Sequence, residues 1–388
     1  MASLETSNKV ILLARDTLNL LGVVRGFGVC GIQPIGILIQ AKTNFCDKSR
    51  FWGKIHRVLD RDEALETLTR LYSGEKKKPI VLPIDDTLMQ MLDQKYEELS
   101  RDFILASFNH ESGKLNFLAD KMNQVALAHE MGYNMLPSKV IHPDDAENVA
   151  DGYPIMLKPA ESSKGGKTFF ICHNEKEYLE AMETSRRCHI ENVILQPYLA
   201  NRTEYVCFGA VCPEKDMVSY TLIRNIRQNP PKHGVGCYSE IVTDPAMMAF
   251  VDELFHKLMQ NGYDGPVDVE FFYDNDAGVF YINEFNWRTS GRNFVALYTK
   301  VYSNYWWYCC KCGRDFSRDN LVNHKNGYTI KLIHDVHNVL HHRVGWLKWL
   351  RQWWTAESHS ALFCSDLMPV LFLTVKMLVG KYKRSRKK

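Results

Sequence analysis

Two strand-like segments joined by a short turn are the feature that most limits how this chain can fold. Residues 267–273 (VDVEFFY) and 279–285 (VFYINEF) are rich in β-branched and aromatic residues. The turn sequence NDAG lies between them, at residues 275–278. Strand-forming runs on both sides of such a turn predict a β-hairpin.

Oxygen-bearing side chains are concentrated on this hairpin. Residues two apart on a strand share one face, so Glu284 and Asn286 point the same way and Glu270 can lie opposite them. Two carboxylates and an amide oxygen suit Mg²⁺ that bridges nucleotide phosphates. Arg288 and Arg292 follow directly, and both can neutralise anionic oxygens near such a metal. Taken alone, a hairpin with an exposed polar face explains the pattern somewhat better.

A loop rich in serine and glycine, residues 161–166 (ESSKGG), is the second chemical signal. It lies between two predicted strands, at 153–159 and 168–171, so its backbone N–H groups could surround a phosphate. The spacing is not that of a P-loop, GxxxxGK[ST]. Taken alone, the loop is typical of a simple turn between strands.

The N-terminal part of the chain predicts an α/β domain. Residues 9–14 (KVILLA) and 35–39 (IGILI) are apolar runs of the kind found in parallel strands. With a helix between them they predict a βαβ unit. The intervening glycines do not spell GxGxxG directly after the first strand, so we do not expect a dinucleotide site here.

Composition bounds the class of protein. The chain has 388 residues, of which 45% are apolar and 24% charged, as in a globular enzyme of two or three domains. A net charge of only +3 argues against nucleic-acid binding. The 11 cysteines are scattered, which predicts reduced thiols. The N-terminus has no signal-peptide pattern, and no apolar run reaches the ~18 residues of a membrane span, so we expect a cytoplasmic protein.

The order of these segments resembles the ATP-grasp superfamily. Three parts carry the resemblance: MLKPAESSKGG at 156–166, ILQPYLANRTEY at 194–205 and DVEFFYDNDAGVFYINEFNWR at 268–288. Together with VLPIDD (81–86), the segment LADKMNQVALAHEMGYNMLPS (118–138) is most similar to the carboxylate–amine ligases that include bacterial D-aspartate ligases. The resemblance runs from about residue 10 to about residue 300.

The resemblance implies a mixed α/β and α+β fold with four parts. An N-terminal α/β domain would cover residues 1–112. The two ATP-grasp subdomains would follow, with the glycine loop in 113–190 and the metal hairpin in 191–302. A helical extension rich in Trp and His would occupy residues 303–388.

The resemblance also implies roles for individual residues. The ATP-binding set is Lys121, Lys158, Ser162, Ser163, Gly165, Gly166, Gln196, Leu199 and Glu204. Within it the lysines would grip the phosphates, the loop would close over them, the segment 196–199 would line the adenine and the glutamate would accept the ribose hydroxyls. Mg²⁺ would be held by Glu270, Glu284 and Asn286. Arg288 would act as the catalytic residue, on the transferring phosphoryl group.

The implied reaction joins a small-molecule carboxylic acid to an amine. ATP would convert the acid to an acyl phosphate, and the amine would then displace phosphate and form a C–N bond. The candidate acid-binding residues are Arg227, His233 and Arg292, with Arg224 and Lys232 in the same segment. Two alternatives stay open: another ATP-grasp chemistry, such as a small-molecule kinase or a carboxylase, and a non-catalytic nucleotide-binding scaffold.

Two departures from the family pattern bear on this expectation. Trp287 stands where the family commonly has proline, which would alter the shape of the substrate site. The strand expected to contact adenine ends in Gln196 and Pro197 rather than in acidic residues, which would reduce hydrogen bonding to the purine.

The C-terminal region adds two further patterns. Cys309 to Cys312 contains CxxC, but no second ligand pair has zinc-finger spacing, so reduced structural cysteines are favoured. The tryptophans and leucines of 346–354 predict an aromatic helix face, and six basic residues lie within 381–388. This combination suits peripheral binding to an anionic membrane. A helical subdomain packed on the core, with a solvated tail, is the alternative.

Overall fold

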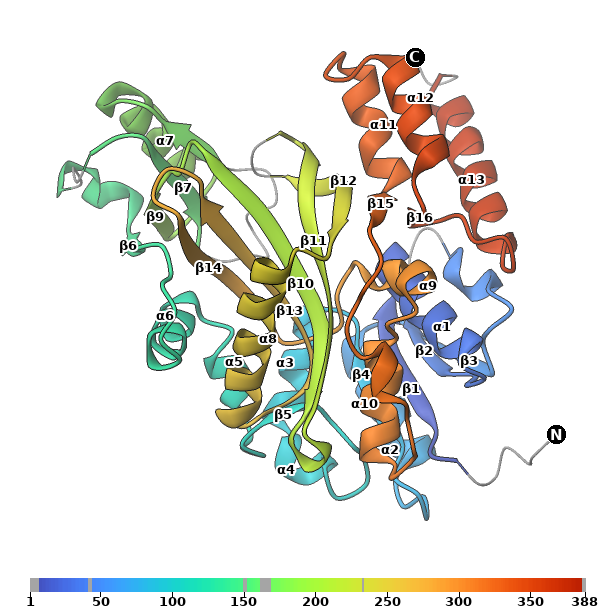
Figure 1. Ribbon diagram of the computed structural model, residues 1–388. Helices are drawn as coiled ribbons and strands as arrows, with labels where there is room; N and C mark the ends of the chain where they lie inside the picture. The colour runs from blue at the N-terminus through green and yellow to red at the C-terminus, as the bar shows by residue number, and fades with distance from the viewer. Residues whose placement is uncertain (1–6, 41–43, 149–151, 161–168, 232–233, 386–388) are drawn as a thin grey trace. The chain divides into compact units, whose positions relative to one another are not determined.

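The computed structural model describes residues 7–40, 44–148, 152–160, 169–231 and 234–385 (Figure 1). The chain divides into two compact units that are not contiguous in sequence. Unit 1 comprises Met1–Asp120, Tyr205–Val269 and Phe285–Lys388, and unit 2 comprises Lys121–Glu204 and Glu270–Glu284. The predicted mixed α/β architecture is confirmed, while the bounds of the four predicted domains stay predictions.

The N-terminal sheet of unit 1 is parallel. Its strands are β1 (Val10–Arg15), β2 (Ile35–Ile39), β3 (Lys54–Val58) and β4 (Ile80–Pro83), in the order β3-β2-β1-β4. Consecutive residues of β1 enter hydrophobic clusters on opposite faces of the sheet, Leu12 in one and Ile11 in the other. Burial on both faces explains why this strand is an uninterrupted apolar run.

Helices connect these strands, as the βαβ pattern predicts. Helix α1 (Leu18–Val29), the short 3-10 helix η2 (Cys46–Lys48) and α2 (Arg61–Tyr72) lie between successive strands, and α3 (Asp86–Gln94), α4 (Tyr96–Leu99) and α5 (Lys114–Phe117) follow β4. The carboxylates of Asp60 and Asp85 accept hydrogen bonds from backbone N–H groups in the first turns of α2 and α3. Gly22 allows α1 to pack closely on the backbone, since a Cβ there would lie 2.7 Å from the nitrogen of Phe294.

A second, eight-stranded sheet follows the order β14-β13-β10-β11-β12-β15-β16, with β5 pairing β13. Its strands are β5 (Ser107–Phe108), β10 (Arg202–Cys212), β11 (Met217–Asn229), β12 (Val235–Val242), β13 (Tyr263–Asp274), β14 (Val279–Asn286), β15 (Gly327–Ile330) and β16 (Ser358–His359). The hairpin expected at 267–285 is the β13–β14 pair. Three of the four boundaries between the units fall within β10, β13 and β14.

One segment of this sheet differs from the sequence expectation. The proline, histidine and glycine content of residues 229–238 predicts a loop. The structure instead begins β12 at Val235. That strand pairs with β11 on one side and β15 on the other, so sheet hydrogen bonds outweigh the weak local propensity.

Unit 2 contains a four-stranded sheet. The strands β6 (Lys139–Ile141), β7 (Ile155–Pro159), β8 (Phe170–Cys172) and β9 (Val193–Pro197) follow the order β6-β9-β7-β8 with antiparallel pairing. Its helices are α6 (Lys121–Glu130), the 3-10 helix η3 (Pro143–Asn148) and α7 (Glu175–Arg187). Tyr178, Ala181 and Met182 of α7 are buried in one cluster with Leu157 of β7, so this helix covers one face of the sheet.

Helices α8 (Pro245–Gln260), α9 (Ala296–Thr299), α10 (Ser303–Lys311), α11 (Leu332–Leu340), α12 (Trp346–Thr355) and α13 (Met368–Ser385) complete unit 1, with the 3-10 helices η4 (Pro213–Lys215), η5 (Asn293–Val295) and η6 (Arg318–Asn320). A buried ion pair ties the C-terminal segment to α1: Arg25 Nε donates to Asp366 Oδ2 at 2.9 Å. No helix within the described residues is long and apolar enough to cross a membrane.

All 11 cysteines lie in described segments, and all are free thiols. Cys309 and Cys310 are buried in the core of unit 1. Burial raises the pKa of Cys30 and Cys312 to about 12. Among the described residues, no group of three or more His, Cys, Asp or Glu could hold a metal ion. The CxxC segment thus has no ligand cluster around it in the described part of the chain.

Candidate functional site

A cluster of lysines and glutamates lies in unit 2. Lys121 begins α6, and its Nζ lies 3.9 Å from Glu284 Oε1. Lys158 on β7 is partly buried beside the same groups. Burial, followed by repulsion from Lys121, lowers the pKa of Lys158 to about 7, although Glu284 and Glu270 act in the opposite direction. The surroundings of Lys158 therefore favour its neutral form.

Strand alternation brings Lys158 and Gln196 to the same face of this sheet. Leu157 is buried against α7, so its neighbour Lys158 projects from the other face. Lys158 pairs with Ile194 and Met156 pairs with Gln196 across the antiparallel β7–β9 ladder. The residues implied for the phosphates and for the adenine thus share the face that α7 leaves uncovered.

Gln196 is buried and only partly satisfied. Its Nε2 donates to Ser138 Oγ at 2.6 Å. Its Oε1 has no hydrogen-bond partner among the residues that the structure describes. A buried acceptor without a donor is costly, and an amino group of a ligand could satisfy it.

The aromatic and acidic residues nearby are organised by Arg202, which sequence reasoning missed. Its guanidinium lies 4.8 Å from the ring centre of Tyr198 and 4.7 Å from that of Phe272. Its Nη2 donates to Glu204 Oε1 at 2.8 Å, and its Nη1 donates to the carbonyl of Leu199 at 3.0 Å. Arg202 thereby fixes both Glu204 and the segment implied for the adenine. The signal available in the sequence was its spacing, two residues before Glu204 on one strand face.

A second charged cluster lies in unit 1, around the buried Asp268. The hydroxyl of Ser290 donates to Asp268 Oδ2. Burial raises the pKa of Asp268, while the positive charges of Arg288, Arg292 and Lys331 act against that rise. Asp268 Oδ1 has no hydrogen-bond partner within the described segments. Three cations therefore act on Asp268, and one of them, Arg288, also pairs with Asp86. Sequence reasoning missed Asp268 and Lys331.

The arginines of this cluster are held by short contacts. Arg292 is buried, and its Nη2 donates to Asn225 Oδ1 at 3.1 Å. Arg288 Nε donates to Asp86 Oδ1 at 2.6 Å, and Arg288 Nη2 donates to Asn286 Oδ1 at 3.3 Å. Asn286 belongs to unit 1, whereas Glu270 and Glu284 belong to unit 2.

Arg227 and Arg292 have different hydrogen-bond partners, although both act electrostatically on the buried Cys237. Arg227 donates to both oxygens of the buried Asp335, at 2.7 and 2.5 Å, and its guanidinium lies 5.0 Å from the ring centre of Tyr238. Arg292 instead donates to Ser239 Oγ. Tyr238 and Ser239 are consecutive on β12 and point to opposite faces, so the two arginines serve different faces of the sheet. The predicted residues Ser162, Ser163, Gly165, Gly166 and His233 lie outside the described residues.

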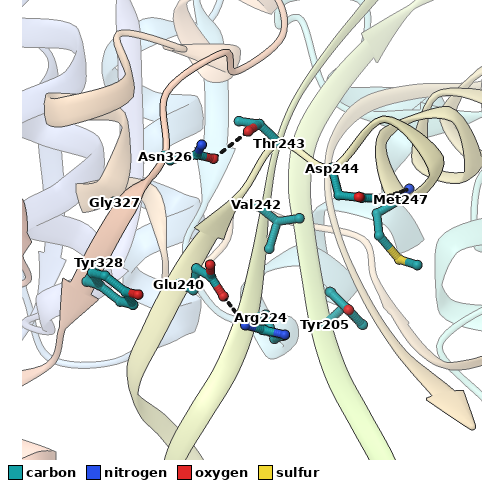
Figure 2. Close-up of a pocket in the computed structure, with 10 residues that line it drawn as sticks. All are labelled: Tyr205, Arg224, Glu240, Val242, Thr243, Asp244, Met247, Asn326, Gly327 and Tyr328. Atoms are coloured by element: carbon teal, nitrogen blue, oxygen red, sulfur yellow. Dashed lines mark hydrogen bonds and ion pairs between the residues drawn. The ribbon is translucent and has the colours of Figure 1, made fainter. Parts of the chain in front are cut away.

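A cavity of about 560 Å³ lies in unit 1 (Figure 2). Its floor includes a row of directly opposed residues on four neighbouring strands, Tyr205, Arg224, Glu240 and Tyr328. Arg224 and Glu240 form an ion pair within it. Because Glu240 follows Ser239 on β12, this cavity lies on the sheet face opposite the Arg292 cluster.

Comparisons with known proteins identify the fold. Residues 120–299 match the family described as "Carbamoyl-phosphate synthase L chain, ATP binding domain". No curated protein sequence matches the chain. The match of residues 120–299 covers the Lys121–Glu284 cluster and the β13–β14 hairpin.

Several solved structures share the architecture at low sequence identity. The biotin carboxylase domain of Hydrogenobacter thermophilus 2-oxoglutarate carboxylase is 16% identical with a TM-score of 0.62, over 83% of this chain and 74% of that one. N5-carboxyaminoimidazole synthetase from Staphylococcus aureus is 14% identical with a TM-score of 0.63, over 87% and 86%. L-amino acid ligase from Bacillus licheniformis is 13% identical with a TM-score of 0.60, over 83% and 79%.

The family match and the shared architecture agree with the order of motifs in the sequence. The resemblance predicted from MLKPAESSKGG, ILQPYLANRTEY and the hairpin is therefore confirmed at the level of the superfamily. The chain carries an ATP-grasp domain and has the ATP-grasp fold.

Proposed function

We propose that this protein is an ATP- and Mg²⁺-dependent ligase that joins a carboxylic acid to an amine, with release of ADP and phosphate. One observation carries the proposal: Lys121, Lys158, Glu270 and Glu284 converge in unit 2, and the pKa of Lys158 is lowered there to about 7. A cation whose charge is disfavoured in the free protein is expected where a ligand supplies negative charge.

The donor atoms suit both cofactors. Glu270 and Glu284 offer carboxylate oxygens, the ligand type that Mg²⁺ prefers. Gln196 Oε1 supplies a buried acceptor that lacks a donor among the described residues, which fits an adenine amino group. Bound MgATP would supply the phosphoryl group that activates the acid.

The chain's own residues then have distinct tasks. Lys121 and Lys158 hold the phosphates and offset their charge. Arg202 keeps the Glu204 carboxylate in place for the ribose hydroxyls. Arg288, braced by Asp86, stabilises the charge that develops on the transferring phosphoryl group. Ser162, Ser163, Gly165 and Gly166 are proposed to exclude water.

The cations that act on Asp268 support a carboxylate as the first substrate. Arg292 and Lys331 both act on this carboxylate electrostatically, so a substrate anion entering the cluster would meet more than one cation. We retain Arg292 as a substrate-binding residue. Arg227 and His233 stay proposals; the ion pair of Arg227 with Asp335 gives that residue a structural role as well.

The solved structures with this architecture include both carboxylases and ligases by name, so the experiment must separate these reactions. Purified protein with MgATP is screened for ADP release with acids alone, amines alone, bicarbonate, and acid–amine pairs. Amide formation predicts ADP release that requires both acid and amine. ADP release with a hydroxyl compound alone would indicate a kinase, release that requires bicarbonate would indicate a carboxylase, and binding of ATP without any turnover would indicate a scaffold.

The role of Arg288 is tested separately. Arg288→Ala should lower kcat by on the order of a hundredfold to a thousandfold while KM for ATP changes little, because the interaction strengthens only in the transition state. Arg288→Lys should restore little, since a point charge does not reproduce the bidentate fork. A normal kcat with a raised KM would make Arg288 a ground-state binding residue instead.

We also propose that the protein acts in the cytoplasm, in peripheral contact with an anionic membrane. The 11 unpaired thiols support a reducing compartment. The six basic residues within 381–388 support attraction to anionic lipid. Deletion of residues 380–388 should weaken vesicle binding while leaving turnover of soluble substrates unchanged.

A further inference from the structure

Helix α12 presents different tryptophans on its two sides. Trp349 Nε1 donates to Asp335 Oδ2 at 3.0 Å, and Trp353 packs against a buried cluster that contains Tyr238 and Ile330. Gln352, between them, accepts a hydrogen bond from Arg227 at 2.9 Å. These three contacts fix one side of α12 to α11 and to the sheet of unit 1 (Figure 1).

The other side of α12 exposes large apolar side chains to solvent. Their exposed fractions are 64% for Trp346, 65% for Leu347, 44% for Leu350 and 79% for Trp354. Residues four apart on a helix lie one above another, so Trp346, Leu350 and Trp354 form a continuous stripe. A soluble protein rarely leaves such a stripe uncovered, which marks it as a contact surface.

Only positive charges accompany this apolar stripe. Lys348 and Arg351 lie on α12, and no Asp or Glu occurs from residue 343 to residue 355. The same bias continues in the sequence from 368 to 388, which has seven basic residues and no acidic one. Leu371 and Val375 of α13 are also exposed, at 55% and 56%.

We infer that the outward face of α12 is the membrane-insertion surface of this protein, which lies in the plane of an anionic bilayer with Trp346, Leu350 and Trp354 at the boundary of headgroups and acyl chains. The inference rests on the membrane contact proposed above and narrows its apolar component from the whole aromatic face of 346–354 to the outward side of α12. Amphipathic helices with tryptophan and leucine on one face and lysine or arginine beside it bind in this way.

Charge complementarity favours lipid over a second copy of the chain. Two copies paired through this face would bring Lys348 and Arg351 of each copy together, and α12 offers no carboxylate to neutralise them. An anionic bilayer supplies the missing negative charge and an apolar layer at the same time. The ordered inner side of α12 also means that little conformational freedom is lost on binding.

The test uses the full-length protein and vesicles of phosphatidylcholine with or without phosphatidylserine, at low and at high salt. The first variant replaces Trp346, Leu350 and Trp354 together with serine. All three side chains are substantially exposed, so the fold should persist. Partition to anionic vesicles should fall by roughly two orders of magnitude, because three side chains no longer enter the bilayer. Leu59→Ser is the control, since Leu59 is 68% exposed elsewhere on unit 1.

The second variant, Lys348→Gln with Arg351→Gln, removes charge but keeps the apolar stripe. It should lower partition to anionic vesicles about 30-fold, at about 1 kcal/mol for each charge near the surface. It should leave the weak binding to neutral vesicles unchanged. Lys54→Gln with Arg101→Gln, two exposed residues on the N-terminal domain, is the matched control.

The outcomes separate membrane insertion through α12 from binding through the basic tail alone and from self-association. If deletion of residues 380–388 abolishes vesicle binding while the serine variant binds normally, the α12 inference is wrong and the tail proposal stands. If the wild-type protein ignores anionic vesicles at low salt, both fail. A concentration-dependent dimer that the serine variant abolishes, without vesicle binding, would make α12 a self-association surface. ATP-dependent turnover, measured in parallel, is unaffected by any of these outcomes and reports on the ligase proposal alone.

Discussion

Lys121 and Lys158 in unit 2 and Arg288 and Arg292 in unit 1 are all cations near carboxylates, but the two pairs are held very differently. Lys121 Nζ stays 3.9 Å from its glutamate, and the pKa of Lys158 is lowered by burial and by its lysine neighbour. Arg288 donates to Asp86 at 2.6 Å, and Arg292 donates to Asn225 at 3.1 Å.

This difference separates charge that the fold leaves for a ligand from charge that serves the fold as well as a ligand. The charge of Lys158 is poorly compensated in the free protein, so a polyanion can improve its environment. The arginines already have hydrogen-bond partners, so they contribute to stability as well as to any chemistry. Substitutions in the two clusters should therefore affect stability and function in different proportions.

The largest effect is expected at Glu284. Glu284→Ala removes a proposed Mg²⁺ ligand and should lower kcat by on the order of a thousandfold, with an unchanged melting temperature. Steady-state ADP release and thermal denaturation check both parts. Glu180→Ala on α7, whose side chain is 67% exposed, is the control within unit 2. Full activity of the Glu284 variant in Mg²⁺ would remove this residue from the site.

Arg292→Met should chiefly affect stability. The change removes hydrogen bonds to Asn225 and Ser239 and takes a positive charge away from the buried Asp268. The free energy of unfolding should fall by about 2–3 kcal/mol, measured by urea denaturation. Arg101→Met, at an exposed position, should leave it unchanged. If the Arg292 variant is as stable as the wild type, the proposed stabilising role of this arginine is wrong.

Lys158→Met should do the reverse. ATP affinity should weaken by about 1.5–3 kcal/mol, the range for a charge-assisted hydrogen bond, as measured by calorimetry. Without ATP the variant should melt at the same temperature as the wild type or higher, because an unfavourable buried charge is gone. Lys176→Met on the exposed side of α7 is the control. A loss of stability with normal ATP affinity would assign Lys158 to the fold instead.

The smallest expected effect is the number of protons that the protein takes up when it binds ATP. With its pKa lowered to about 7, Lys158 is mostly neutral at pH 8 in the free protein, and bound phosphate favours its charged form. ATP binding should then take up close to one proton at pH 8 and much less at pH 6, and affinity should fall as pH rises above 7. Calorimetry in two buffers of different ionisation enthalpy measures the uptake, and Lys158→Met corrects for the protons of ATP itself. Equal uptake by wild type and variant contradicts the assignment.

The lowered pKa of Lys158 also determines whether stability rises or falls with pH. The unfolded chain keeps the Lys158 proton up to its ordinary pKa of 10.5, whereas the folded chain releases it near 7. Between these values the unfolded state binds more protons, so stability rises with pH in this window. The stability gained by Lys158→Met should therefore be larger at pH 6 than at pH 9.

The hairpin and the N-terminal βαβ unit could be predicted from the sequence because their signals are local. These signals are alternation on the strands, apolar runs and a turn of suitable composition. It could not reveal β12, whose hydrogen bonds come from β11 and β15. For the candidate site, Lys121, Lys158 and Glu284 followed from the order of motifs. Arg202, Asp268 and Lys331 did not, since their importance arises from side chains far apart in the sequence. The aromatic face predicted for 346–354 was a single surface, whereas burial divides it into an inner and an outer side.

Each unit has an exposed cysteine that a thiol-specific reagent can label. Cys188 at the end of α7 and Cys364 before α13 are exposed, one in unit 2 and one in unit 1. The other cysteines are buried or partly buried, where maleimide reagents react slowly. The unmodified protein can therefore take one spin label or fluorophore on each unit without prior removal of cysteines. Distances between these labels, recorded with and without MgATP, would then follow the two units during turnover.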